Sequence, residues 1–365
     1  MASMPLMQSF RRPLLTLGFA LLVLGLISGC ESISYYGQAA QGQMSLLLAR
    51  EPIAERLTQH SLPDAERRKL QLVLDARVFA EQTLLLDAGD SYLSYVELER
   101  PFVLWNVFAA PEFSTSPVNW CYPIAGCVSY RGYFAETAAR RAAARLTEDG
   151  FDVYSGGVDA YSTLGWFADP LTSSVLRRSE HGLVALLFHE LAHRRVYVPG
   201  DTTFNESFAT FVEQEGLRRW LQANSQAGSQ AGLKESVAQQ IALEDSTQAQ
   251  FVALVTGYRD RLTALYAESL EPMQMRARKE AIQQELRDEY AVLRQQWGYA
   301  GYDRWFAGPL NNAQLATVAS YNDLVPAFAA LLEEVGGDLE QFYERVMTLV
   351  ELPEAERREV LESLL

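Results

Sequence analysis

The sequence predicts a predominantly helical α+β fold, in which a small β-sheet lies beside a helix that carries an HExxH motif and a long helical hairpin follows in the C-terminal half. Two observations predict this. Residues 92–134 are aromatic, β-branched and interrupted by proline, which is typical of strands and turns. Most other segments repeat apolar residues at helical spacing. We find no internal repeat, so residues 30–365 are expected to form one domain.

In the first half, a short helical pattern follows a polar stretch within residues 31–60. A second helix is expected over residues 63–86, since Pro63 and Asp64 suit the start of a helix. After the strand region, an alanine-rich helix is expected over residues 135–148. The next segment, 151–167, is expected to form two short strands around Gly156-Gly157.

In the second half, helices are expected over residues 172–197, 203–222, 234–268, 271–297 and about 310–365. A polar linker of small residues is expected over residues 223–233. The two long helices that follow it are expected to form a hairpin over about 234–297, joined near Pro272. The catalytic core is then expected over about 90–222, ahead of this hairpin.

The composition excludes several classes of protein. The chain has 365 residues, of which 48% are hydrophobic and 21% charged, so it is neither disordered nor fibrous. Its 31 Lys+Arg and 46 Asp+Glu residues give a net charge of −15. This acidic excess argues against a general nucleic-acid binder, because few phosphates could be neutralised. We therefore expect no nucleic-acid partner.

The N-terminus has the features of an export signal. Arg11 and Arg12 precede an apolar segment that is short for a membrane-spanning helix. The segment ends in Ile27-Ser28-Gly29-Cys30, which resembles a bacterial lipobox. The resemblance implies a signal peptide over residues 1–29 and acylation of Cys30, which would attach the protein to a membrane. The alternative is an uncleaved anchor with an incidental cysteine.

The residue after Cys30 is Glu31 rather than the aspartate that resembles an inner-membrane retention signal. We therefore expect attachment to the outer membrane, facing the oxidising periplasm. There, the remaining Cys121 and Cys127 are expected to form a disulfide that closes a small loop. Two buried thiols are the alternative, and metal binding by this pair is disfavoured because no other Cys or His lies nearby in the sequence.

The motif with the clearest chemistry is His189-Glu190-Leu191-Ala192-His193. On a helix, residues four apart lie about 40° apart around the axis, so both imidazoles can bind one ion. Glu190 is turned by about 100° and can take a proton from a metal-bound water. This HExxH pattern is the metalloprotease motif.

A third ligand is expected downstream. A catalytic zinc ion takes three protein ligands and keeps one position open. Glu206 lies in an amphipathic helical segment after a turn at Pro199-Gly200, which allows two antiparallel helices to meet at the ion. Glu213 shares its helix face and is expected to accept a hydrogen bond from a ligand imidazole. The alternative for Glu213 is a solvated acid.

HELAH (189–193) followed by NESFATF (205–211) resembles the gluzincin metallopeptidases, in particular aminopeptidase N-like enzymes. Thr210 and the absence of a GxMEN segment depart from the thermolysin-like and aminopeptidase N-like patterns. The whole mature chain is more similar to a bacterial family of predicted lipoprotein aminopeptidases. The matching segments are WCYPIAGCVSYRGYF (120–134), GVDAYSTLGWFADPL (157–171) and GPLNNAQLATVASYNDLVPAF (308–328), besides the two metal-motif segments.

The resemblance implies a zinc-dependent aminopeptidase that acts on peptides. Zinc would activate the water and Glu190 would be the general base. Donors for the oxyanion are expected among Tyr130, Arg131, Tyr133 and Tyr161, although each also suits a structural role. A strand near Tyr161 is expected to pair with an extended substrate.

Other polar residues are expected to be structural. Asn311, Asn312 and Tyr321 are expected to cap and pack helices rather than line the cleft. His181 is expected to be structural and His60 to lie in a surface turn.

Two other functions stay open. One is a lipid-anchored periplasmic scaffold or chaperone with a structural metal, in which the helical hairpin binds a partner. The other is a zinc endopeptidase. An aminopeptidase needs a carboxylate for the α-amine of the substrate, for which Asp159 and Glu136 are the candidates.

Overall fold

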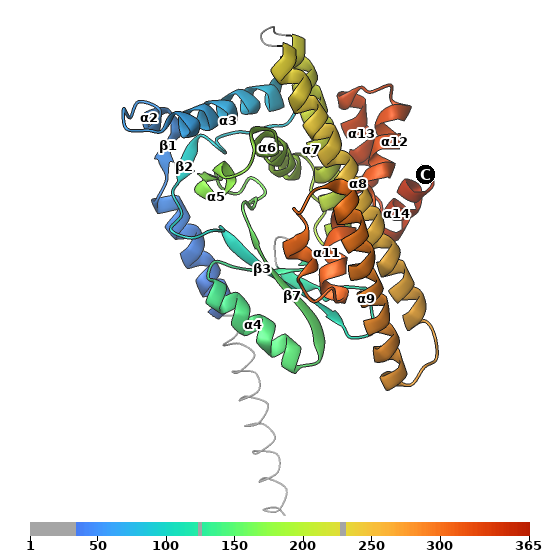
Figure 1. The fold of residues 1–365 in the computed structure, drawn as a ribbon. Helices are drawn as coiled ribbons and strands as arrows, with labels where there is room; N and C mark the ends of the chain where they lie inside the picture. Colours follow the sequence, from blue (N-terminus) through green and yellow to red (C-terminus); the bar gives the residue numbers. More distant parts are fainter. Residues whose placement is uncertain (1–33, 123–125, 227–230) are drawn as a thin grey trace, which may run out of the picture. The chain divides into compact units, whose positions relative to one another are not determined.

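The computed structural model describes residues 34–122, 126–226 and 231–365 (Figure 1). The chain divides into two compact units, Met1–Ala49 and Arg50–Leu365. The described part of the first unit is a helix over residues 34–48. The expected signal peptide and Cys30 lie outside the described residues.

Helices predominate in the second unit and small sheets accompany them, which confirms the predicted fold class. The strands are β1 (Glu51–Pro52), β2 (Ser94–Val96), β3 (Leu104–Pro111), β4 (Trp120–Tyr122), β5 (Gly126–Val128), β6 (Arg131–Tyr133), β7 (Phe151–Val158) and β8 (Leu171–Thr172). The helices up to the metal centre are α2 (Ile53–Arg56), α3 (Asp64–Gln82), α4 (Glu136–Glu148), α5 (Ser173–Leu176), α6 (Glu180–Arg195) and α7 (Thr202–Gln226). The later helices are α8 (Ala231–Tyr266), α9 (Pro272–Trp297), α10 (Asp303–Phe306), α11 (Asn312–Asn322), α12 (Val325–Glu334), α13 (Leu339–Val350) and α14 (Glu354–Glu362).

The main sheet has the strand order β6-β3-β7, with both outer strands antiparallel to β3. Helices α4 and α11 pack against β3 and β7. The predicted turn at Gly156-Gly157 is wrong, because both glycines lie inside β7, opposite Asn106 and Trp105. A Cβ atom at Gly157 would overlap the ring of Phe102. The glycine therefore permits a close approach of that ring rather than a turn.

The predicted helix over 172–197 is interrupted, which corrects its expected start. Helix α5 ends at Leu176, and α6 begins at Glu180. The hydroxyl of Ser179 accepts a hydrogen bond from the amide of Gly182 at 3.2 Å. A serine N-cap satisfies an amide that the first turn of a helix leaves unpaired, so it favours a new start here.

Two hydrophobic cores stabilise the second unit. The first joins α3, α6, α7, α12 and α13, and its buried rings include Phe188, Phe204, Phe208, Phe328 and Phe342. The second joins α8, α9, α10 and α11. The apolar stretch Asn312–Glu334 is long and apolar enough to cross a membrane by composition. Half of its most apolar window is buried inside the protein, where it forms α11 and α12 of these cores.

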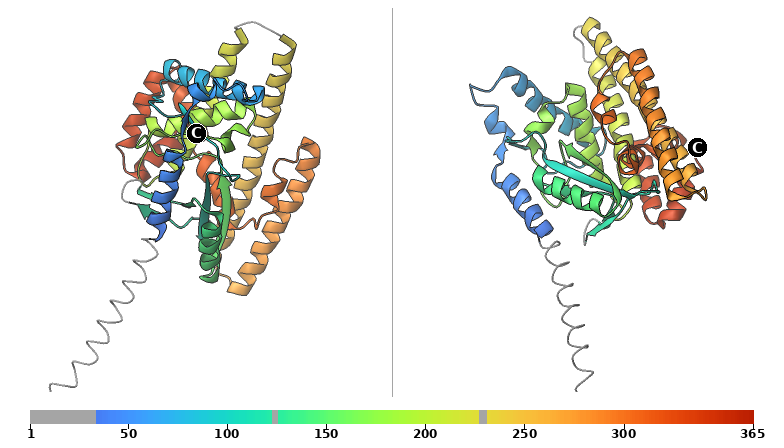
Figure 2. Two further views of the ribbon diagram at one scale, coloured as in Figure 1. Left: turned by 90° about the vertical axis from the view of Figure 1, so that its left-hand side faces the viewer. Right: turned by 60° about the horizontal axis from the view of Figure 1, so that its bottom comes forward.

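The long helices α8 and α9 form a hairpin in the region that the sequence predicted. They lie side by side in Figure 1 and in both views of Figure 2, where α8 is yellow and α9 orange. Pro272 occupies the first turn of α9, where its missing amide hydrogen costs no hydrogen bond. Gly298 ends α9 in the left-handed conformation, with φ of 62°.

Candidate metal centre

Helix α6 carries His189, Glu190 and His193 into the protein interior. Almost every residue from Leu183 to His193 is buried, because α6 packs against both α3 and α7. Burying these polar side chains is unfavourable unless they find partners. For the two histidines, the partners come from α7.

Glu206 of α7 lies opposite the two histidines. Its Oε2 atom is 3.4 Å from Nε2 of His189 and 3.6 Å from Nε2 of His193. All three side chains are buried, and their ligand atoms lie within 4.8 Å of one another. These are the three residues that the sequence suggested as ligands.

The arrangement fits a divalent cation better than a set of hydrogen bonds. Glu206 Oε2 is buried and has no hydrogen-bond partner among the described residues. Zinc bonds of about 2.0–2.2 Å in tetrahedral geometry place ligand atoms about 3.3–3.5 Å apart. The observed 3.4 and 3.6 Å are close to that spacing. Two imidazoles and one carboxylate therefore form a site that suits zinc.

Glu213 orients the first ligand. It lies seven residues after Glu206 on α7, and its Oε2 accepts a hydrogen bond from Nδ1 of His189 at 3.0 Å. This contact places the proton on Nδ1 and leaves Nε2 available for a metal. On the other side, the ring of Tyr321 stacks against His189 with centroids 6.0 Å apart and an angle of 18°. His189 is thus held by contacts on two sides.

The charges of the metal-free site are tightly coupled. Burial lowers the pKa of His189, but the close carboxylates of Glu206 and Glu213 raise it to about 10. Burial raises the pKa of Glu206, but the charges of His193 and His189 hold that pKa below its ordinary value. These carboxylates favour the protonated form of His189 in the metal-free protein, and a metal that binds at Nε2 displaces the proton there.

Glu190 lines a cleft beside His189. It has neither a hydrogen bond nor an ion pair with any described residue, although it is only 8% exposed. Burial raises its pKa above the ordinary value, against the charges of His189 and His193, which lower it. A raised pKa brings a carboxylate closer to the range where general bases work at neutral pH.

The cleft has a volume of about 510 Å³ and is lined by His189 and Glu190 among others. One wall consists of the end of β7 and the two residues after it, Arg178 just before α6, and parts of α6 and α7. The other wall comes from α8, the start of α10 and α11. The second wall is lined by Gln248, Phe251, Val252, Tyr302, Thr317, Val318, Tyr321 and Asn322.

The expected oxyanion donors do not line this cleft. Tyr161 packs its ring against Phe134 at 5.8 Å, in a loop rather than the expected strand. Tyr130 packs against Phe108 at 5.8 Å. Arg131 lies in β6 with Tyr133 at its other end. None of Tyr130, Arg131, Tyr133 and Tyr161 is among the residues that line the cleft.

Tyr321, unlike those residues, lines the cleft. The sequence favoured a packing role for it, whereas the structure places it in the cleft wall beside His189. Burial raises its pKa well above the ordinary value, and the negative charge of Glu206 raises it further. Its phenol therefore keeps its proton and can donate it in a hydrogen bond. Asn311 and Asn312, by contrast, cap α11 and bind backbone carbonyls, as the sequence favoured.

The two candidates for binding a substrate amine differ in position. Asp159 lines the cleft, but its carboxylate is paired with Arg178 at 3.0 Å and lies 3.9 Å from Arg177. Glu136 pairs with Arg140 on α4 and does not line the cleft. The structure therefore brings Asp159, but not Glu136, to the site.

Residues that the sequence analysis did not single out fix the turn between α6 and α7. The side chain of Asn205 bonds both to the amide of Val198, at 2.7 Å, and to its carbonyl, at 2.8 Å. Asp201 accepts a hydrogen bond from the amide of Phe204 and pairs with the buried Arg357 at 2.7 Å. Asn205 directly precedes a ligand, which is the local signal that could have identified it.

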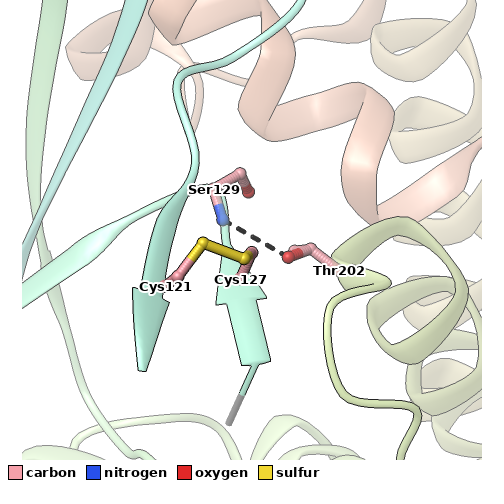
Figure 3. Close-up of a disulfide and its surroundings, with 4 residues drawn as sticks. All are labelled: Cys121, Cys127, Ser129 and Thr202. Carbon is pink, nitrogen blue, oxygen red and sulfur yellow. Dashed lines mark hydrogen bonds between the residues drawn. A yellow bond between two sulfur atoms is a disulfide. The ribbon is translucent and has the colours of Figure 1, made fainter. Parts of the chain in front are cut away.

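A disulfide joins Cys121 and Cys127 across the β4–β5 hairpin (Figure 3). The amide of Ser129 then donates a hydrogen bond to the hydroxyl of Thr202 at 3.3 Å, as Figure 3 shows. Thr202 is the first residue of α7, so the hairpin contacts the helix that carries Glu206. His181 binds Glu244 of α8 at 2.8 Å and is not part of the metal centre.

The chain was matched by one family model. That model is described as "Putative aminopeptidase", and it matches residues 34–361. The match covers the metal centre and the helical hairpin alike. No curated protein and no solved structure matches the chain.

Proposed function

Since the chain belongs to the family described as "Putative aminopeptidase", we propose that it is a zinc-dependent peptidase, and specifically an aminopeptidase. The observation that carries the proposal is the convergence of His189, His193 and Glu206, with Glu190 facing the same cleft. The ligand group comprises three side chains among the described residues, which leaves a fourth position for water, as in catalytic zinc sites. A scaffold with a structural metal would need that position filled by protein.

A zinc ion bound there supplies a Lewis acid that polarises the scissile carbonyl and lowers the pKa of a water molecule. Glu190 accepts the proton from this water and delivers it to the nitrogen of the leaving amine as the C–N bond breaks. Glu213 keeps His189 in the tautomer that presents Nε2. Tyr321 donates a hydrogen bond to the carbonyl oxygen as negative charge develops on it.

The test of this proposal is the Glu190→Gln variant. We expect kcat to fall by about 10²–10⁴-fold, because a general base contributes that much, while zinc content is unchanged. The matched control is Glu180→Gln, an exposed glutamate at the start of the same helix. A Glu190→Gln variant with the kcat of the unmodified protein would refute the proposed role of Glu190.

One observation favours endopeptidase action as a second candidate. Asp159, the acid brought to the cleft apart from Glu190 and Glu213, is already paired with Arg178. A free α-amine would have to compete with this guanidinium. Cleavage of matched peptides with free and acetylated N-termini separates the two functions, since an aminopeptidase cleaves only the free form.

We further propose that the protein is attached to the outer membrane through acyl chains on Cys30 and faces the periplasm. The lipobox-like segment at residues 27–30 supports this. A disulfide between Cys121 and Cys127 suits an oxidising compartment of this kind.

A further inference from the structure

We infer that the wall of the cleft formed by α8, α10 and α11 is a subsite for a large apolar side chain of the substrate, next to the bond that is cleaved. The inference rests on the proposed peptidase function and names the class of substrate. It also gives the helical hairpin a role in the site, instead of the partner-binding role that the alternative scaffold function would give it.

The charges in the cleft are distributed unevenly. Its charged side chains are Asp159, Arg178, Glu190 and Glu213, together with His189. All of them come from α6, α7, the segment just before α6 and the segment just after β7. The described residues of the opposite wall include no charged side chain. A charged substrate residue placed against that wall would lose water without gaining an opposite charge, which is unfavourable, and around Phe251, Val252 and Val318 it would meet apolar side chains.

The neutral wall is rigid and aromatic. The ring of Phe251 stacks on Tyr302 with centroids 4.1 Å apart and an angle of 3°. Trp305 meets the same ring edge-on at 5.1 Å. Phe251 and Val318 belong to the second hydrophobic core, whereas Leu186 on the opposite wall packs against the first. The subsite therefore lies where the two cores face each other and is formed before any ligand binds.

Polar contacts on both sides of this segment fix α8 against the cleft. His181 of α6 binds Glu244 at 2.8 Å, on the N-terminal side of the cleft-lining residues of α8. Arg259 lies 3.6 Å from Asp323, which follows α11, on the C-terminal side. Val252 lies between these contacts, lines the cleft and is partly exposed. It is an apolar residue of the subsite that can be altered without replacing a fully buried side chain of the core.

The experiment measures kcat/KM of the Val252→Glu and Val292→Glu variants on a set of peptides. These peptides differ only in the residue next to the cleaved bond, which is Phe, Leu, Ala or Glu. Val292 is a matched control because it lies on α9, is 55% exposed and does not line the cleft. In the unmodified protein we expect kcat/KM to be about 10- to 100-fold higher for Phe and Leu than for Ala and Glu. Val252→Glu should remove most of this preference, and Val292→Glu should leave it intact.

Binding is measured beside catalysis, by calorimetry with the same peptides on the Glu190→Gln protein. Tighter binding of Phe and Leu peptides to Glu190→Gln, with no cleavage of any of them by the unmodified protein, would support the subsite and refute the peptidase. Cleavage with equal kcat/KM for all four peptides, or a preference unchanged in Val252→Glu, would refute the subsite alone. If the peptides are neither bound nor cleaved, both the subsite and the peptidase function are refuted.

Discussion

Glu213 orients His189 through one hydrogen bond, so a single substitution of Glu213 tests this contact. Its hydrogen bond to Nδ1 fixes the ring and raises the basicity of Nε2. Such a contact acts through the ligand, so its loss should weaken metal binding without removing the site. The Tyr321 ring on the other side of His189 would still restrict the imidazole.

We expect Glu213→Ala to lower zinc affinity by about 10- to 100-fold, which is the usual effect of losing a hydrogen-bond partner of a ligand. Competition with a chelator of known affinity measures this change. The neighbouring Gln214→Ala is the control, since Gln214 is exposed on the same helix. Equal zinc affinities in Glu213→Ala and Gln214→Ala would contradict the orienting role.

The contact between α6 and α7 sets the geometry of the site, because α6 carries the two histidines and α7 carries Glu206. Their close approach depends on Gly216 of α7. A Cβ atom at this position would lie 2.8 Å from both Leu84 and Phe188, the residue that precedes the first ligand. Such a short contact would force these side chains, or the helices that carry them, to shift.

We expect Gly216→Ala to lower the free energy of unfolding by about 1–3 kcal/mol, because it overpacks this contact. Gly257→Ala in α8 is the matched control, since a Cβ atom added there would meet no neighbouring side chain within 4 Å. That control should raise stability by up to about 1 kcal/mol, through the better helix propensity of alanine. Chemical denaturation measures both, and equal changes in the two variants would refute the packing argument.

The C-terminal helix contributes to the site from the far end of the chain. Arg357 of α14 is buried, pairs with Asp201 at 2.7 Å and lies 5.0 Å from the ring centroid of Phe204. It also donates a hydrogen bond to the carbonyl of Leu352 at 3.0 Å. These contacts fix the start of α7, which places Glu206.

We expect Arg357→Ala to lower the free energy of unfolding by about 3–5 kcal/mol, as is typical when one partner of a buried ion pair is removed. Arg358→Ala removes an exposed ion pair with Glu362 and should cost about 0.5 kcal/mol or less. Thermal and chemical unfolding of the two variants measure the difference. Similar losses of unfolding free energy in the two variants would show that Arg357 does not stabilise the contact between α14 and α7.

Much of the fold and the ligand set could be predicted because the signals are local. HExxH lies on one helix, and Glu206 follows after a short turn, so few arrangements are possible. The break between α5 and α6 and the continuous strand through Gly156-Gly157 could not be read from periodicity. The break depends on the N-cap at Ser179, and the continuous strand depends on the packing of the Phe102 ring against Gly157.

The residues of the cleft wall formed by α8, α10 and α11 could not be predicted from the sequence, for a different reason. Tyr321 and Val252 meet the site only through packing between helices far apart in the chain. Tyr321 lies on a mostly buried helix, where an aromatic residue ordinarily packs into the core. Its place beside His189 depends on how α11 docks against α7.

The most direct test of the metal centre is the zinc-to-protein ratio of the purified protein after dialysis against metal-free buffer, measured by inductively coupled plasma mass spectrometry. We expect one zinc ion per chain, and a ratio far below one in His193→Ala, which removes a ligand. The centre would be refuted by a protein that holds no zinc even after loading with excess metal. A His193→Ala variant that still retains one ion per chain would contradict it equally.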